Sequence, residues 1–255
     1  MFYQGSDMNS EADAQSAAPS IDEQQAFYDK FWGGYPVELG GAEVRRLAAV
    51  LDGLSDHLNE LRRTSPGTPR ICDFGCGRGW LAGEMTKFGN VVGVDLSPEG
   101  VELAQKAWPN VRFEVGDVTK WRPGYEFDLI VSSEVLEHIV DKRSFVETVC
   151  AILRPGGYVI LTTPNKRMQN RFHQTHQIIE DWTTTRQLKG LFSSEFVVLR
   201  HETFVFDFSY EGLYRITSAP KLLQAISTYG LRNVYDGLRK SLHMGLYQLL
   251  VAKKR

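Results

Sequence analysis

Short apolar runs alternate with helix-length amphipathic segments through the middle of the chain. The runs lie at residues 71–74, 91–94, 111–115, 127–131 and 158–161, roughly 15 to 30 residues apart. This alternation predicts repeated βαβ units and therefore an α/β fold with a doubly wound, parallel sheet. Sheets of this kind bind their ligands at the carboxyl ends of the strands.

Beyond Pro164 the alternation becomes irregular. Two further strand candidates, at 195–201 and 245–252, bracket a helical stretch at about 210–243. They bring the prediction to seven strands in a mostly parallel sheet. We expect the insert at about 205–244 to form a helical cap over the substrate pocket, while the spacing of its apolar residues is equally typical of ordinary packing.

The N-terminal part of the chain changes character at about residue 20. Residues 1–20 contain no Lys or Arg and are mostly small or polar, so we expect a disordered tail. Helical patterns follow at 22–35, which is rich in aromatic residues, and at 41–63. We expect residues 21–255 to form one domain with a ligand-binding core at about 68–165.

Composition and charge restrict the classes of function. The 255 residues are 42% hydrophobic and 24% charged, which excludes a largely disordered or fibrous protein. The net charge of -2 predicts no overall attraction to nucleic acid or to an anionic membrane, so a nucleic-acid partner is disfavoured. Three cysteines without zinc-site spacing indicate reduced thiols and a cytoplasmic location. No apolar run predicts a membrane span, and no export signal is recognised.

A glycine-rich turn follows the first predicted strand. Three glycines stand at alternate positions within 75–79, which lets the backbone approach a ligand closely and differs from the G-x-G-x-x-G spacing of dinucleotide sites. Asp73 precedes the turn, and Asp95 and Asp117 end the next two strands. Asp95 is placed to accept hydrogen bonds from the hydroxyls of a ribose. Asp117 is placed to accept a hydrogen bond from the exocyclic amine of an adenine. The set suits a nucleoside without phosphates.

Two further motifs, the segments 127–138 and 153–157, follow the glycine turn and the acidic strand ends along the chain. With these motifs in this order, the chain resembles the class I S-adenosylmethionine-dependent methyltransferases. These enzymes have a Rossmann-like fold, and the resemblance is strong over about residues 68–165. Within this family, the segments EVLEH at 134–138 and TTPN at 162–165 are similar to the branch of ubiquinone-biosynthesis O-methyltransferases and small-molecule tailoring enzymes.

The resemblance implies S-adenosylmethionine as cofactor, S-adenosylhomocysteine as product, and a set of residues that hold the cofactor. By resemblance, the methionine part lies over Gly75, Cys76 and Gly77, the ribose is held by Asp95 and Leu96, and the adenine is flanked by Asp117 and Val118. The cofactor set also includes Asp73, Trp80 and Ser133. In relatives a helix before the first strand closes over the cofactor, so Tyr28 or Trp32 either contacts the sulfonium or packs in the core.

The loop after the fourth strand carries the candidate catalytic groups. If Glu134 begins a helical turn, its side chain shares one face with Glu137 and His138, directed toward the transferred methyl group. His138 could remove a proton from a hydroxyl acceptor. Alternatively, the three groups could hold a divalent metal, as in similar Glu-x-x-Glu-His sites of RNA-end and quinone methyltransferases, with His173 or His176 as a further ligand. His176 is therefore counted with Glu134, Glu137 and His138 among the candidate catalytic residues.

These observations predict an enzyme that methylates a small molecule, most readily at a hydroxyl oxygen. The alternatives are N-methylation of a small amine, metal-dependent methylation of an RNA end, and a regulatory module that binds the cofactor without catalysis. Arg45 and Arg46 are expected to be solvated, with an arginine near the carboxylate of the cofactor as the alternative. The oligomeric state stays open, with a homodimer among the choices.

Overall fold

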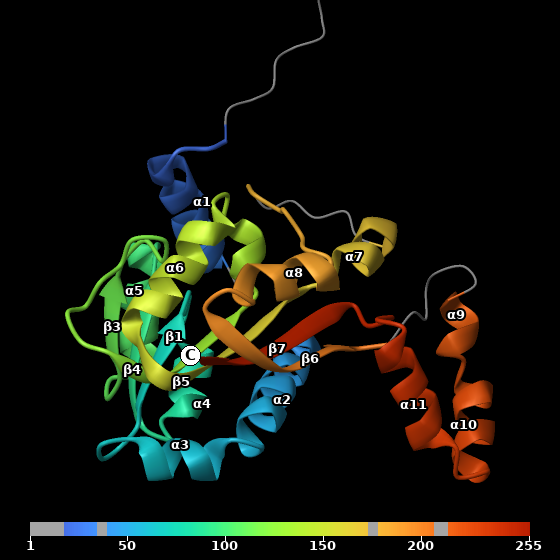
Figure 1. Cartoon of the computed structure of the whole chain (residues 1–255). Coiled ribbons are helices and arrows are strands. Elements are labelled where there is room, and N and C mark those ends of the chain that lie inside the picture. Colours follow the sequence, from blue (N-terminus) through green and yellow to red (C-terminus); the bar gives the residue numbers. More distant parts are fainter. Residues whose placement is uncertain (1–17, 35–39, 173–177, 207–213) are drawn as a thin grey trace, which may run out of the picture.

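The computed structural model describes residues 18–34, 40–172, 178–206 and 214–255, and their centre is a seven-stranded sheet (Figure 1). Its strand order is β3-β2-β1-β4-β5-β7-β6. Neighbours from β3 to β5 pair in parallel, whereas β7 is antiparallel to both β5 and β6. The strands are β1 (Arg70–Phe74), β2 (Asn90–Asp95), β3 (Arg112–Val115), β4 (Phe127–Ser133), β5 (Leu153–Pro164), β6 (Phe196–Phe204) and β7 (Tyr247–Lys254). The predicted doubly wound, Rossmann-like and mostly parallel sheet is confirmed.

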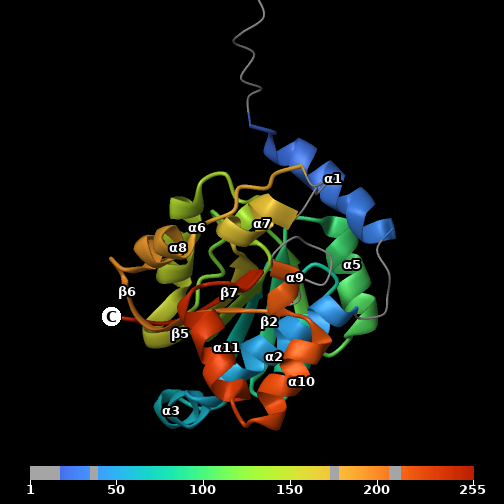
Figure 2. The same cartoon turned by 90° about the vertical axis from the view of Figure 1, so that its right-hand side faces the viewer.

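Helices cover both faces of this sheet, because the strands bury side chains on both sides. One core lies under α6 and α8, and the other under α2, α3, α4 and α5 (Figures 1 and 2). The helices before β5 are α1 (Ile21–Gly34), α2 (Gly41–Ser55), α3 (Leu58–Thr64), α4 (Trp80–Met85), α5 (Pro98–Ala107), the 3₁₀ helix η1 (Leu136–His138) and α6 (Lys142–Ile152). Later helices are α7 (Lys166–Phe172), α8 (Thr185–Phe192), α9 (Tyr214–Thr217), α10 (Pro220–Thr228) and α11 (Arg232–Ser241).

The single helix predicted at 41–63 is wrong, because the chain turns between α2 and α3. His57 leaves the helical conformation, with φ −120° and ψ −4°, and its ring stacks on Tyr158 at 5.1 Å between centroids. The turn places Glu60 of α3 where it accepts a hydrogen bond from the Tyr158 hydroxyl at 2.5 Å. Tertiary contacts to β5 therefore override a continuous helical pattern.

The insert between β6 and β7 contains α9, α10 and α11 in its described part. These helices project from the far edge of the sheet, on the side opposite α5 (Figure 1). None of the residues described between 214 and 244 lines the cavity discussed below. Residues 207–213 lie outside the described residues, so the role of the insert as a cap over the substrate stays a prediction. Most of the expected N-terminal tail also lies outside them. None of the described helices has the length and apolar content to cross a bilayer.

Candidate active site

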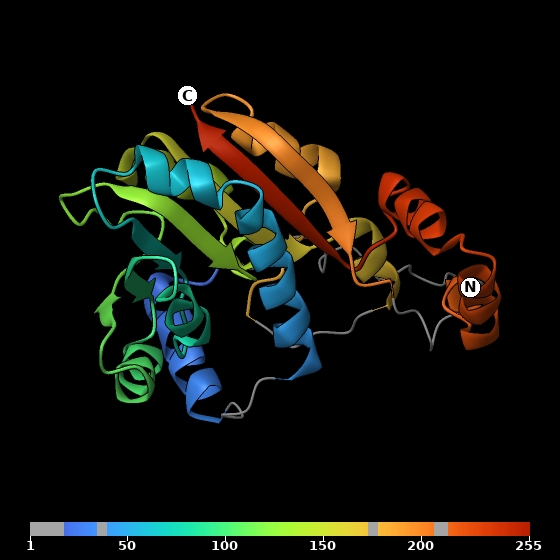
Figure 3. The same ribbon diagram turned by 90° about the horizontal axis from the view of Figure 1, so that it is seen from below.

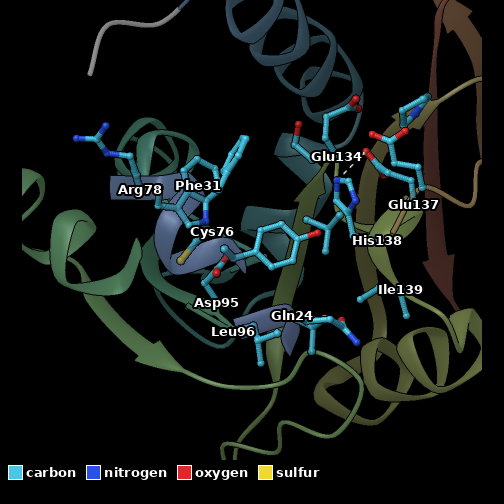
Figure 4. Close-up of a pocket in the computed structure, with 18 of the residues that line it drawn as sticks. Gln24, Phe31, Cys76, Arg78, Asp95, Leu96, Glu134, Glu137, His138 and Ile139 are labelled. Atoms are coloured by element: carbon cyan, nitrogen blue, oxygen red, sulfur yellow. Dashed lines mark ion pairs between the residues drawn. The ribbon is translucent and has the colours of Figure 1, made fainter. Parts of the chain in front are cut away.

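One cavity of about 930 Å³ runs along the carboxyl ends of the parallel strands. Figure 4 shows Cys76 and Asp95 on one side of it and Glu134, Glu137 and His138 on the other. Eight of the ten predicted cofactor residues line this cavity: Gly75, Cys76, Trp80, Asp95, Leu96, Asp117, Val118 and Ser133. The structure therefore brings together at one site residues that the sequence spreads over nearly 60 positions.

The glycine turn is built from backbone contacts that a side chain would disturb. The amides of Gly75 and Cys76 both donate to the carbonyl oxygen of Val94, at 2.8 and 2.9 Å. Gly75 has φ +86°, and a Cβ atom there would lie 2.3 Å from Val135. Glycine is required at this position for both its conformation and its close approach to the loop after β4.

Asp95 connects the turn to the start of α5. Its carboxylate accepts hydrogen bonds from the amide of Gly77 at 2.7 Å and from the amide of Ser97 at 3.0 Å. Burial raises the pKa of Asp95, while these two amide bonds lower it. Each carboxylate oxygen keeps capacity to accept a second hydrogen bond, so the group is oriented toward a ligand by the backbone.

The two other predicted cofactor residues, Asp73 and Gly77, lie behind the wall of the cavity. Asp73 is almost fully buried, and burial raises its pKa to about 7. Gly77 is covered by Trp32, since a Cβ atom on Gly77 would lie 2.4 Å from the indole ring. The cofactor contacts expected of both residues stay predictions.

Helix α1 closes the cofactor side of the cavity. Its residues Tyr28, Phe31 and Trp32 line the wall. Asp29 on the same helix accepts hydrogen bonds from the Ser97 hydroxyl at 2.5 Å and from the amide of Glu99 at 3.1 Å, at the first turn of α5. The helix is therefore fastened to the same loop that Asp95 orders.

The other end of the cavity is formed by the loop after β4. Glu134 is in the left-handed conformation with φ +58°, and η1 follows at 136–138. The buried Glu137 accepts a hydrogen bond from the Thr163 hydroxyl at 2.9 Å. Burial raises the pKa of Glu137 to about 7, and burial together with the charge of Glu137 raises the pKa of Glu134 well above its usual value. Both carboxyl groups therefore keep a proton at a higher pH than a glutamate in water.

The His138 ring is oriented by a backbone carbonyl, and its burial favours the neutral imidazole. Its Nδ1 atom lies 2.7 Å from the carbonyl oxygen of Ile179, which can only accept a hydrogen bond. Nδ1 therefore carries the proton, and Nε2 keeps a free lone pair, 3.8 Å from a Glu137 carboxyl oxygen. Burial lowers the pKa of His138, which favours this neutral form.

The predicted metal site has no support from the described residues, which contain no group of three His, Cys, Asp or Glu side chains arranged to hold an ion. Glu137 accepts a hydrogen bond from Thr163, and His138 is hydrogen-bonded to the carbonyl oxygen of Ile179. His173 and His176 lie outside the described residues, so their predicted roles as ligand or catalytic group stay predictions.

Several residues of this end were missed by sequence reasoning. Arg46, expected to be solvated, is only 14% exposed and lies in the wall, 2.9 Å from Glu43 and 3.9 Å from Glu134. Gln169 and Tyr247 also line the cavity, from α7 and the first residue of β7. The only signal for Arg46 is that it shares the inward stripe of α2 with Glu43 and Val50.

Comparison with known proteins identifies the family. A methyltransferase domain model matches residues 44–235. The ubiquinone biosynthesis O-methyltransferase of Methylobacterium sp. (strain 4-46) is 37% identical over 110 residues, 39% of this chain and 43% of that protein. The match therefore spans less than half the length of that relative.

Solved structures share the fold at lower identity. The [4+2]-cyclase SpnF is 20% identical with a TM-score of 0.61, covering 93% of this chain and 97% of that chain. The N-methyltransferase NodS of Bradyrhizobium japonicum, in complex with S-adenosylhomocysteine, is 14% identical with a TM-score of 0.58, covering 92% and 96%. The chain belongs to the methyltransferase domain family, with the fold of the class I S-adenosylmethionine-dependent methyltransferases.

Proposed function

We propose that this chain transfers a methyl group from S-adenosylmethionine to a hydroxyl oxygen of a small molecule and releases S-adenosylhomocysteine. The proposal rests on one observation: a single cavity joins the glycine turn and Asp95 to the neutral imidazole of His138. The homology to ubiquinone biosynthesis O-methyltransferases supports the same reaction class.

The residues present fit the cofactor. The backbone turn at Gly75 and Cys76, which lines the cavity, and the buried carboxylate of Asp95 suit its methionine and ribose parts, with Asp117 and Val118 also in the wall. When bound, S-adenosylmethionine supplies an electrophilic methyl group on a positively charged sulfur. Tyr28 and Trp32 would exclude water from this end of the cavity and offer aromatic faces.

The other end of the cavity suits an acceptor that bears hydroxyl groups. His138 Nε2 can take the proton of an attacking hydroxyl, while Nδ1 stays bonded to Ile179. The Tyr28 ring reaches this end too, with its centroid 5.8 Å from that of the His138 ring. Two buried polar atoms on the wall, the Tyr28 hydroxyl and Gln169 Oε1, have no hydrogen-bond partner within the described part of the chain. They are available to orient the acceptor for in-line attack.

A labelled-methyl assay tests this function. Purified protein is incubated with methyl-labelled S-adenosylmethionine and an extract of the source cells, which is then separated into small-molecule and precipitable fractions. We expect the label among small molecules, with and without a chelator. Label in the precipitate would replace the proposal with a protein or RNA acceptor, and loss of label with chelator would restore the metal hypothesis.

A further inference from the structure

The acceptor end of the cavity has one wall that is built from four distant segments. It consists of Arg46 of α2, Glu134 after β4, Gln169 of α7 and Tyr247 of β7, all of which line the cavity. Helix α2, light blue in Figure 3, lies on the face of the sheet to which β7, in red, contributes. Arg46 Nη1 lies 3.9 Å from Glu134 Oε2, and the guanidinium lies 5.8 Å from the ring centroid of Tyr247. We call these four residues the polar wall.

Two oxygen atoms of the polar wall have no hydrogen-bond partner within the described part of the chain. Gln169 is only 2% exposed, and its Nε2 atom donates to the carbonyl oxygen of Leu246 at 3.4 Å, whereas its Oε1 atom accepts no hydrogen bond. The buried Oε1 atom of Glu134 accepts none either. An amide oxygen only accepts hydrogen bonds, and so does an ionised carboxylate. Because buried polar atoms are normally satisfied, a ligand at this wall should donate hydrogen bonds.

The charge of the acceptor end is unbalanced toward the negative. Four described carboxyl residues line this end: Glu43, Glu134, Glu137 and Glu180. Of the described basic residues in the cavity wall, Arg78 and Lys120 belong to the glycine turn and to the loop of Asp117, which leaves Arg46 for this end. Arg46 lies closer to Glu43, at 2.9 Å, than to Glu134. The described side chains therefore provide more negative than positive charge around an acceptor.

The two carboxyl groups after β4 lack a full counter-charge among the described residues. Lys142, whose charge also acts on Glu137, is paired with Asp181 at 2.7 Å. Burial raises the pKa of Glu137 and of Glu134, as expected for carboxyl groups that no cation fully balances. A positively charged group of a ligand would stabilise their ionised forms and take the place of their protons.

We infer that the acceptor bears a protonated primary or secondary amine as well as its hydroxyl group, and that the polar wall binds this ammonium through Glu134 and Gln169. The inference rests on the proposed function, because it names the class of acceptor for that same site. The two accepting oxygens require at least two N–H donors, which a primary or secondary ammonium supplies together with a positive charge. A carboxylate or phosphate has no donor and would be repelled, and a neutral hydroxyl has a donor without the charge.

The charge of the methylated product tests this class of acceptor. Purified protein is incubated with methyl-labelled S-adenosylmethionine and the small-molecule fraction of the source cells, and the labelled product is separated from the cofactor by chromatography. Acetic anhydride removes the charge of a primary or secondary amine, so we expect it to shift the product toward the anode in electrophoresis at pH 7. A labelled product whose mobility does not change would overturn the inference and leave the proposed function standing. Absence of any labelled product would count against the proposed function itself.

Two variants test whether the polar wall recognises the amine. Glu134→Gln removes the charge and Gln169→Leu removes the second accepting oxygen. With the small-molecule fraction titrated as acceptor, each should raise the apparent KM by at least about tenfold, while the Kd for S-adenosylmethionine stays within about twofold. The control is Glu147→Gln, which removes a carboxylate that is 61% exposed on α6 and should change neither value.

Two results with these variants would overturn the inference. An unchanged KM in both Glu134→Gln and Gln169→Leu would show that the polar wall does not bind the acceptor. Weaker cofactor binding by Glu134→Gln with an unchanged KM would assign the negative charge to the sulfonium of the cofactor.

Discussion

The two ends of the cavity are held by different kinds of contact. At the cofactor end, backbone amides orient the key groups: Gly77 and Ser97 both donate to Asp95. At the acceptor end, side chains from distant segments meet, with Arg46 of α2 beside Glu134 and Gln169 of α7 on the same wall. The first end depends on local geometry, and the second on tertiary contacts and protonation.

This difference predicts a separation of functions. Changes at the cofactor end should alter affinity for S-adenosylmethionine, because the ribose, the part proposed to be held by Asp95, does not react. Changes around His138 should alter turnover, because a proton acceptor acts only as the acceptor hydroxyl attacks. If variants at the two ends changed cofactor affinity and turnover together, the two ends would not have separate functions.

The largest effect is expected from His138→Gln. Loss of the proton acceptor should lower kcat by about 10²- to 10³-fold, while the Kd for S-adenosylmethionine stays within about twofold. Steady-state kinetics and calorimetry give the two values. The control is His57→Gln, which removes a ring stacked on Tyr158 away from the cavity. Full turnover by His138→Gln would favour an amine acceptor, which needs no such base when it arrives neutral.

The next effect is expected from Asp95→Ala. Removing a carboxylate whose charge-assisted hydrogen bonds contribute about 1.5–3 kcal/mol each should raise the Kd for S-adenosylmethionine by at least about tenfold. Glu102→Gln, on the exposed side of α5, serves as the control. Calorimetric binding equal to that of the wild type would contradict the assignment of Asp95 to the cofactor.

Stability should reveal the protonation of the acceptor end. The folded-state pKa of Glu137 is raised from 4.5 to about 7, so the folded protein holds a proton that the unfolded chain releases. The free energy of unfolding should therefore fall as the pH rises from about 4.5 to 7, by up to about 3 kcal/mol from this group.

Urea denaturation at pH 5 and pH 8 measures this loss. Glu137→Gln should reduce the difference, because the neutral amide does not ionise. Glu60→Gln should leave it unchanged, since the pKa of Glu60 is lowered to about 2 and its titration lies below this range. An equal difference in Glu137→Gln and the wild type would show that Glu137 ionises normally.

The smallest effect is expected where α1 is fastened to α5. Asp29→Ala removes the bonds to Ser97 and to the amide of Glu99, and should speed dissociation of S-adenosylmethionine by about three- to tenfold. Stopped-flow tryptophan fluorescence measures the rate, with Trp32 as a reporter in the wall. Asp22→Ala, exposed on the same helix, is the control. An unchanged rate would show that Asp29 does not hold the helix closed.

Sequence reasoning found the cavity residues that directly follow strands, at both ends, and missed those that distant segments bring to the acceptor end, for a physical reason. The turn at 75–79 and Asp95 stand at fixed distances from apolar strands, so the sheet alone brings them together. Arg46 and Tyr247 are more than 200 positions apart, and only the packing of α2 and β7 places both on one wall. The turn at His57 between α2 and α3 was missed for the same reason, because it depends on a tertiary contact, the stacking of His57 on Tyr158.

Identification of the methylated atom tests the central claim most directly. S-adenosylmethionine carrying a ¹³C-methyl group is incubated with the protein and the small-molecule fraction of the source cells, and the product is analysed by carbon NMR. An O-methyl resonance, strongly reduced with His138→Gln, is the predicted result. An N-methyl resonance, or stoichiometric cofactor binding without any methylated product, would contradict it.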